Sequence, residues 1–257
     1  MTIVHTVAEW QELRGSDIFH GKTVGFVPTM GALHAGHASL LERARAANDL
    51  VVLSIFVNPT QFNDPRDLDK YPRTWEADIA LARRAGVDAI FAPTHAMMYP
   101  DEYHYRVSED RLSTLMEGAH RPGHFDGVLT VVLKLLLLVR ADRAYFGEKD
   151  LQQLLLIQGM AEAFFIPTTI VACETVRADD GLALSSRNAL LTPAGRARAP
   201  EFGRVLREES DPAAAKRRLE AAGLGVDYIE HYEHWRLGAV RLDGIRLIDN
   251  VRCKDPV

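Results

Sequence analysis

Hydrophobic positions in the first two-thirds of the chain follow two alternating patterns. Short apolar runs of strand length cover residues 23–27, 50–57, 87–92, 143–146 and 168–173. Apolar residues at helical spacing cover residues 36–48, 74–86, 126–140 and 149–164. Strands that alternate with helices form crossovers with parallel strands, so the pattern predicts an α/β fold with a doubly wound parallel sheet.

The pattern changes beyond Asn188. Helical stretches begin at Thr192 and Asp211, and three short runs at residues 226–230, 239–242 and 245–248 are typical of strands. We therefore expect two domains, a large one over residues 1–176 and a small C-terminal α+β domain over residues 177–257.

Composition narrows the classes of function. The chain holds 35 acidic and 30 basic residues, which argues against a nucleic-acid partner because neutralising phosphates needs a basic surplus. Two cysteines, Cys173 and Cys253, are too few for a disulfide framework or a thiolate zinc site, which favours the cytoplasm. The longest apolar run, residues 128–139, is shorter than the ~20 residues of a membrane span. With no signal-peptide pattern at the N-terminus, we expect no membrane contact.

The first candidate site is the segment from Pro28 to His37, where a predicted strand ends and a predicted helix begins. Ligands of doubly wound sheets bind at such strand ends. Gly31 and Gly36 allow a close approach of the backbone, and the first N–H groups of a helix favour a phosphate. The imidazoles of His34 and His37 could stabilise phosphate oxygens during nucleotidyl transfer. A pair of loop histidines and a metal site are the competing interpretations.

Two further segments follow strand ends. Asn58 and Gln61 offer neutral amides suited to hydroxyl and carboxylate groups, although an ordinary Asn-Pro turn has the same sequence. Lys149 falls in the first turn of a predicted helix, where the helix dipole disfavours a cation, and a bound anion would remove that conflict. Gln153 lies on the same helix face. The alternative for Lys149 is a solvated side chain between acidic neighbours.

Two polar segments lie elsewhere in the chain. Ser185, Ser186 and Arg187 match the donor set of a triphosphate clamp, with a polar linker or a helix cap as the alternative. Arg121 and two histidines between Glu117 and Asp126 lead into the apolar helix. They could line a pocket or contact a second subunit.

Taken together, these segments resemble the pantothenate synthetase (pantoate–β-alanine ligase) family of the HxGH nucleotidylyltransferase superfamily. The resembling stretches keep the family's order and are Pro28 to His37, Ser54 to Phe62, Tyr71 to Thr74, Glu117 to Gly127, Tyr145 to Gln153, Asp180 to Asn188 and Arg246 to Asn250. The resemblance implies a Rossmann-like domain that binds ATP and pantoate, a small C-terminal lid domain and a homodimer. The stretch between Tyr228 and Arg246 is short for the family.

Carried over by position, the resemblance also implies roles for single residues. The catalytic residues would be His34, His37, Lys149, Ser185 and Arg187, with His37 as proton donor. The substrate-binding residues would be Asn58, Gln61, Arg121 and Gln153, with Gln61 also near β-alanine. The ATP-binding residues would be Pro28, Thr29, Met30, Gly31, His34, Gly36, His37, Gly147, Glu148, Lys149, Asp150, Val176, Leu184, Ser185, Ser186 and Arg187. Mg²⁺ would accompany ATP, and its ligands stay open, with Asp78 and Asp150 as candidates.

The implied reaction condenses pantoate with β-alanine through a pantoyl adenylate and releases AMP and pyrophosphate. A carboxylate is already a nucleophile at neutral pH, so positioning and charge stabilisation suffice. Two other classes remain open. A nucleotidylyltransferase acting on a phosphorylated substrate should carry basic residues in the substrate loop, and a non-catalytic nucleotide-binding module would lack the acid-binding amides.

Overall fold

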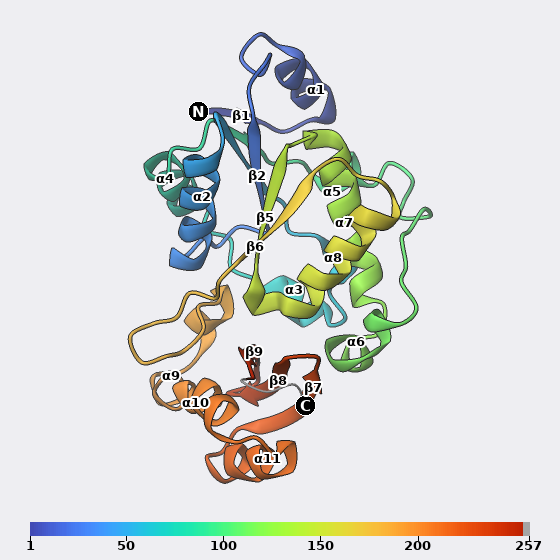
Figure 1. The fold of residues 1–257 in the computed structure, drawn as a ribbon. Helices are drawn as coiled ribbons and strands as arrows, with labels where there is room; N and C mark the ends of the chain where they lie inside the picture. Colours follow the sequence, from blue (N-terminus) through green and yellow to red (C-terminus); the bar gives the residue numbers. More distant parts are fainter. Residues whose placement is uncertain (254–257) are drawn as a thin grey trace.

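The structure, a computed structural model, describes residues 1–253 and contains two sheets with their helices (Figure 1). The larger sheet is parallel, with the strand order β1-β4-β3-β2-β5-β6. Its strands are β1 (Thr2–Val4), β2 (Val24–Thr29), β3 (Leu50–Ile55), β4 (Ala89–Phe91), β5 (Arg143–Gly147) and β6 (Thr169–Cys173). The order reverses between β2 and β5, so the carboxyl ends of these two strands form the switch point where ligands of such sheets bind.

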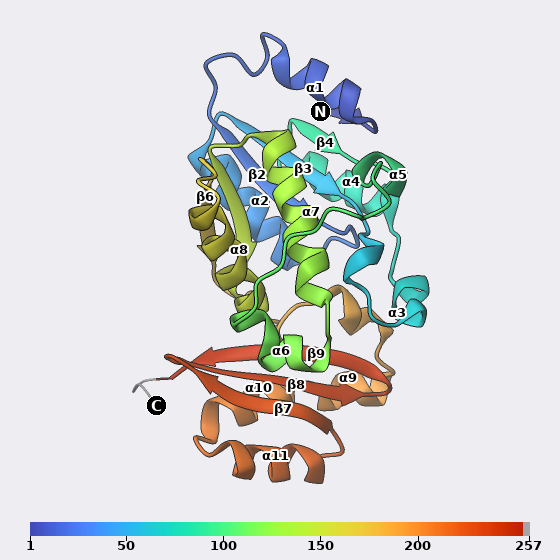
Figure 2. The same ribbon diagram turned by 90° about the vertical axis from the view of Figure 1, so that its right-hand side faces the viewer.

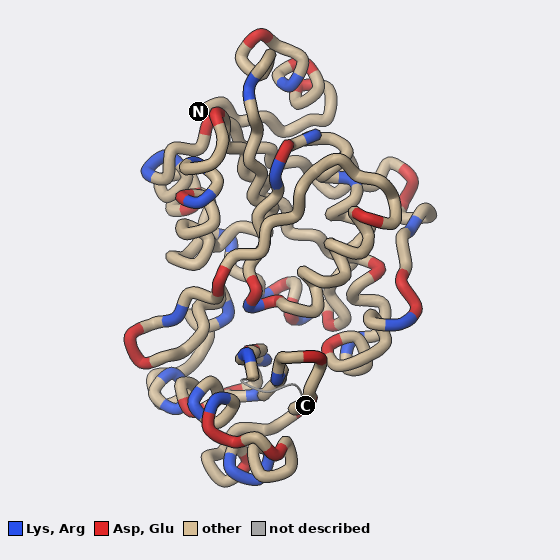
Figure 3. Tube along the Cα trace, in the orientation of Figure 1, with Lys and Arg blue, Asp and Glu red and all other residues tan. Residues whose placement is uncertain are grey.

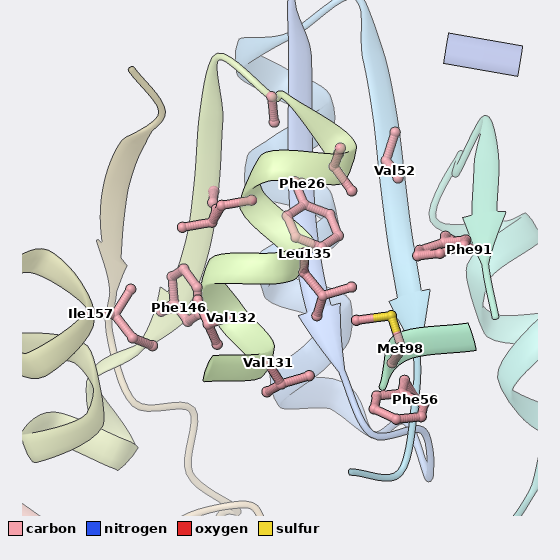
Figure 4. Packing of buried hydrophobic residues seen from close by; sticks show 14 of the residues in the cluster. Phe26, Val52, Phe56, Phe91, Met98, Val131, Val132, Leu135, Phe146 and Ile157 are labelled. Atoms are coloured by element: carbon pink, nitrogen blue, oxygen red, sulfur yellow. The ribbon is translucent and has the colours of Figure 1, made fainter. Parts of the chain in front are cut away.

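Helices cover both faces of this sheet, which confirms the predicted doubly wound fold. The first face carries α2 (Ala35–Ala47) and α4 (Trp75–Arg84), and the second carries α1 (Val7–Gly15), α7 (His124–Val139) and α8 (Leu151–Ala163). Figure 4 shows side chains of α7, among them Val132 and Leu135, packed beside Phe26 and Phe146 of the sheet. In Figure 3 the trace of the main sheet is largely free of charged residues, as the apolar runs predict.

Shorter elements connect these helices and strands. They are α3 (Pro65–Lys70), α5 (His95–Met98), α6 (Met116–His120) and the 3₁₀ turns η1 (Pro59–Gln61), η2 (Leu112–Thr114), η3 (Glu148–Asp150) and η4 (Ser186–Leu190). Within residues 1–253, every helix is too short or too polar to cross a membrane. The apolar run at residues 128–139 belongs to α7, whose side chains pack against the main sheet.

The second sheet is antiparallel and consists of β7 (Gly225–Tyr232), β8 (Trp235–Leu242) and β9 (Ile245–Arg252). Its helices are α9 (Pro193–Arg198), α10 (Pro200–Glu208) and α11 (Pro212–Ala221). In Figure 2, α11 lies on the side away from the main sheet, and α6 lies on the side that faces it. A separate apolar cluster formed by residues 182–251 packs these elements together.

Four predictions of local structure are corrected. The sequence pattern missed β1, because an edge strand of three residues is too short to show a periodicity. The predicted helix from Thr192 is two helices, since Pro200 occupies the first turn of a new one. The three C-terminal strands are longer than predicted, because their pairing continues to the tight turns at residues 233–234 and 243–244. The predicted helix from residue 149 begins at Leu151, after the turn η3.

Candidate active site

A cavity of about 660 Å³ lies at the switch point, between the main sheet and the C-terminal sheet. Residues predicted for the site line it from six segments of the chain. These are Pro28, Thr29, Met30, His34, Gly36, His37, Asn58, Gln61, Arg121, Gly147, Lys149, Asp150, Gln153, Val176, Leu184, Ser185, Ser186 and Arg187. Gly31 and Glu148 are not among the lining residues. The histidine turn and Lys149 therefore share one cavity with the two glutamines.

The two histidines cap the start of α2 with their own side chains. The backbone N–H of Gly36 donates to Nδ1 of His34 (3.1 Å), and the backbone N–H of His34 donates to Nδ1 of His37 (3.3 Å). A ring nitrogen that accepts carries no proton, so the proton of each neutral ring lies on Nε2. Gly36 permits this arrangement, because a Cβ there would lie 2.9 Å from the His34 ring. Both rings thus have one N–H group left for a ligand.

Burial controls the charge of these two rings. Loss of solvation lowers the pKa of His34 to about 4, and nearby Lys149 contributes to the same shift. The same causes, burial first and then the neighbouring His34 and Lys149, lower the pKa of His37 to about 3. At neutral pH both imidazoles are uncharged donors of hydrogen bonds. The role of His37 as proton donor stays a prediction, and in this charge state its ring offers a hydrogen bond from Nε2–H.

Asp78 holds the histidine turn in place. Its buried carboxylate accepts the backbone N–H groups of Ala32 (2.9 Å) and Leu33 (2.8 Å) and the hydroxyl of Thr74 (3.0 Å). The backbone is left-handed at both Gly31 (φ +80°) and Ala32 (φ +51°), a region that strains a residue with a side chain. Asp78 was a candidate neighbour of magnesium. Its oxygens are committed to the turn, so its role is structural.

Lys149 lies in the turn η3 immediately before α8. Its side chain is 16% exposed, and its Nζ is 3.7 Å from a carboxylate oxygen of Asp150. The alternative of a solvated side chain is therefore wrong. The side-chain amide of Asn250, from β9, donates to the backbone carbonyls of Glu148 (2.8 Å) and Lys149 (2.9 Å). The C-terminal sheet thus supports the turn that carries this cation.

The side-chain amides of Asn58 and Gln61, in the loop after β3, have different roles. Asn58 is buried, and its amide donates to the side-chain oxygen of Gln61 (3.0 Å) and to the carbonyl of Gly127 (3.2 Å). Its oxygen accepts the hydroxyl groups of Thr60 (3.0 Å) and Tyr99 (2.8 Å). Since these bonds occupy the amide of Asn58, it holds Gln61 in position and has little capacity left for a substrate.

The loop with the hydroxyl groups contacts the histidine turn across the cavity. Ser186 donates its hydroxyl to the carbonyl of Ala32 (3.0 Å), and Ser185 accepts the backbone N–H of Arg187 (3.3 Å). The guanidinium of Arg187 donates to Asp67, 2.8 Å away on α3. The loop is therefore tied to the histidine turn and to α3, which the alternative of a free polar linker does not explain. The alternative of a helix cap holds for Ser185, which caps η4.

Sequence reasoning missed a buried carboxylate, Glu117, as a centre of charge in the site. It pairs with Arg121 (3.2 Å) of the same segment and with Arg246 of β9. Burial opposes ionisation of this carboxyl, but the two arginines lower its pKa below the ordinary value. Glu117 and Arg246 stood in matching segments, but a contact between residues 129 positions apart leaves no periodic signal in the sequence.

A metal ion bound by protein side chains alone needs several ligands close together. Within residues 1–253, no three side chains of the His, Cys, Asp and Glu types lie close enough together to form a metal site. The interpretation of the two histidines as part of a protein-built metal centre is therefore not supported. Cys173 is buried and free, as expected for a core residue.

Together, the doubly wound sheet, the helix cap made by two imidazoles and the cation at the switch point define an α/β enzyme of the nucleotide-binding class. A model of the family described as pantoate-beta-alanine ligase matches residues 2–252. The chain therefore belongs to the pantoate-beta-alanine ligase family, which confirms the resemblance drawn from its motifs.

Individual relatives support the same family assignment. A pantothenate synthetase of Bdellovibrio bacteriovorus is 59% identical over 230 residues, which cover 90% of this chain and 92% of the relative. One of Legionella pneumophila is 51% identical over 250 residues, with 97% and 99% covered. Since both are covered almost completely, the short C-terminal part is not peculiar to this chain.

Solved structures show the same fold. The pantoate-beta-alanine ligase of Francisella tularensis, complexed with beta-gamma ATP and beta-alanine, superposes with a TM-score of 0.94 at 39% sequence identity. The superposition covers 98% of this chain and 97% of the Francisella chain. A pantothenate synthetase of Thermus thermophilus gives a TM-score of 0.88 at 44% identity, with 98% and 99% covered.

Proposed function

We propose that the protein catalyses the ATP-dependent condensation of pantoate with β-alanine to pantothenate, through a pantoyl adenylate. The observation that carries this proposal is the shared cavity. Donors suited to a triphosphate, His34, His37 and Lys149, line it together with two amides suited to an organic acid, Gln61 and Gln153. Membership of the pantoate-beta-alanine ligase family supports the same substrates.

In the first step, a carboxylate oxygen of pantoate attacks the α-phosphorus of ATP. The new P–O bond forms as the bond to pyrophosphate breaks, and the negative charge moves to the leaving pyrophosphate. The Nε2–H groups of His34 and His37 and the ammonium of Lys149 would donate hydrogen bonds to the oxygens that gain charge. Neutral imidazoles suit this task, because donation needs no proton transfer.

In the second step, the amine of β-alanine attacks the acyl carbon of the adenylate. The amide bond forms, the bond to AMP breaks, and the amine releases its protons to solvent. Gln61 and Gln153 would hold the pantoyl group, with Asn58 acting through Gln61. Water would hydrolyse the adenylate, so its exclusion by residues 181–188 and the C-terminal sheet is part of the proposal.

The remaining nucleotide contacts would come from the cavity rim. They are the backbone from Pro28 to Gly31, Gly36, the turn from Gly147 to Asp150, Val176 and the segment from Leu184 to Arg187. Gly31 and Glu148 are not among the residues that line the cavity and would act through their neighbours. Arg187 is already ordered at the rim by Asp67, where a triphosphate oxygen would compete for the same guanidinium.

Mg²⁺ fits this site only together with ATP. Magnesium in proteins is commonly held by one or two carboxylates and by substrate phosphates, and the carboxylate of Asp150 lines the cavity beside Lys149. Asp150 would hold the ion, which would neutralise part of the triphosphate charge.

We also propose that the chain divides into two domains between residues 176 and 177, as predicted. The separate apolar cluster of the C-terminal part supports this division.

We further propose that the protein is a homodimer. Large exposed side chains near the ends of α7 and α8, namely Leu137, Phe164 and Phe165, support an association between chains. Sedimentation equilibrium of the purified protein tests the dimer.

One exchange experiment tests the function. We expect labelled pyrophosphate to enter ATP only when pantoate is present, because formation of the adenylate is reversible. Exchange without pantoate would indicate a different acceptor, and exchange with a phosphorylated acceptor alone would indicate the other nucleotidylyltransferase class. No exchange with any acceptor, despite ATP binding, would leave the non-catalytic module as the better description.

A further inference from the structure

A cluster of four buried or half-buried charges joins the C-terminal sheet to the acid side of the cavity. Arg246 of β9 is 15% exposed at its side chain and donates to Asp227 of β7 (2.7 Å) and to Glu117 of α6. Glu117 in turn accepts from Arg121 (3.2 Å). Figure 2 shows α6 facing the C-terminal sheet at this place. The cluster is therefore the main polar contact between α6 and β9.

Both the side chain and the backbone of Glu117 are connected to elements that carry the proposed acid site. Arg121, held by Glu117, donates its second N–H group to the backbone carbonyl of Gln61 (3.0 Å). The backbone N–H of Glu117 donates to the side-chain oxygen of Gln152 (3.0 Å), the neighbour of Gln153. A displacement of Glu117 would therefore reach the Gln61 loop through Arg121 and the start of α8, which carries Gln153, through Gln152.

Arg246 determines how the charge of Glu117 is shared. With Arg246 in place, the carboxylate is divided between two guanidinium groups. Without it, the buried charge would have Arg121 as its remaining cation and would draw that side chain toward itself. Arg121 would then lose its bond to the carbonyl of Gln61, because one guanidinium cannot keep both geometries when it moves. A buried charge that loses a partner has a strong effect on its neighbours.

We propose that Glu117 and Arg246 are positioning residues that couple the docking of the C-terminal sheet to binding of the acid substrate. Neither needs to touch the reacting atoms. Arg246 of the docked sheet pairs with Glu117, Glu117 positions Arg121, and Arg121 together with the ring of His124 holds the backbone carbonyl of Gln61. The inference rests on the proposed function, since it assigns the acid to Gln61 and Gln153.

The test compares Arg246→Met and Arg246→Lys with the wild type in steady-state kinetics. We expect Arg246→Met to raise the KM for pantoate on the order of tenfold, a typical coupling between sites, while the KM for ATP stays unchanged. Arg246→Lys should lie closer to the wild type, because an ammonium still pairs with Glu117. The control is Arg204→Met, which removes an exposed ion pair with Glu201 on α10, away from the cavity, and should change neither KM.

A purely structural role of Arg246 would give different kinetic results. A fall in kcat with unchanged KM for pantoate, or equal rises in both KM values, would overturn the inference, as would a methionine variant identical to the wild type. Glu117→Gln is the second variant, and combining it with Arg246→Met should raise the KM for pantoate no further than the larger single effect. Additive effects of the two substitutions on the KM for pantoate would contradict the inference that Glu117 and Arg246 act through the same contacts. If the wild type itself shows no pantoate-dependent exchange, the proposed function fails; if it does and these KM values do not move, this inference alone fails.

Discussion

Replacing Asp78 with Asn tests whether one carboxylate shapes the histidine turn. The change keeps the size of the side chain and one oxygen, but it turns the other oxygen into an NH₂ group. That group would face either the N–H of Ala32 or that of Leu33, both of which now donate to Asp78 at 2.9 and 2.8 Å. Two facing donors cannot bond, so one buried N–H group loses its partner.

The magnitude follows from these bonds. Leaving a buried donor unpaired costs about 1–3 kcal/mol, and the surviving bond weakens because its acceptor loses the charge. We therefore expect Asp78→Asn to lower the free energy of unfolding by about 2–4 kcal/mol. The left-handed backbone at Gly31 and Ala32 would relax, and His34 and His37 would lose their alignment. A fall in kcat should accompany the loss of stability.

Denaturant unfolding measures the free energy, and amide hydrogen exchange of Ala32 and Leu33 measures the turn itself. We expect these two amides to exchange faster in the variant. Glu76→Gln, an exposed change in the first turn of the same helix, is the matched control and should behave as the wild type. Unchanged stability and unchanged exchange would refute the reasoning. Recovery of activity by added Mg²⁺ would instead return Asp78 to the role of a magnesium neighbour.

Two other predictions concern the charged groups of the cavity. Lys149→Ala should lower kcat on the order of 10²–10³-fold, as for removal of one donor to a developing charge, with a nearly unchanged Tm because Asn250 holds the backbone of this turn. Lys216→Ala, on the exposed face of α11, is its control. For His37, the pKa of about 3 lies below the ordinary value of 6.5, so the unfolded chain binds the proton more tightly. Stability should then rise with pH between about 3 and 6.5 and level off above, and His37→Gln should reduce that slope by up to one proton.

Both predictions have a clear opposite outcome. A Lys149→Ala variant that turns over at a near-normal rate would remove this cation from the proposed mechanism. Equal slopes of stability against pH in the wild type and in His37→Gln would mean that the pKa of this ring in the folded protein lies near its ordinary value of 6.5, and the lowered pKa would be wrong.

The sequence was informative where local pattern and topology act together. Parallel strands place their carboxyl ends at one edge, so the segments after β2, β3 and β5 could be assigned to one site from the sequence alone. The cavity that holds His37 and Lys149 confirms this step. A pattern of apolar residues also located five strands of the main sheet and the helices α2, α4, α7 and α8 to within a few residues, but it missed β1 and α1.

Other features depend on contacts that no local pattern records. The amide of Asn58 matched a substrate-binding group by type, but only the fold shows that Gln61, Gly127, Thr60 and Tyr99 already use it. The charge state of the histidines follows from burial, which spacing does not determine. Glu117 gains its role from Arg246, and that pairing arises only when the two sheets meet.

The bonds from Asn250 to the turn that carries Lys149 have a practical consequence. A cation of the proposed nucleotide site is supported by a strand of the other sheet, and that strand also lines the cavity. Removal of the C-terminal sheet would therefore release the turn under Lys149 as well as open the cavity. Loss of activity in a truncated enzyme would then not distinguish exclusion of water from placement of this cation.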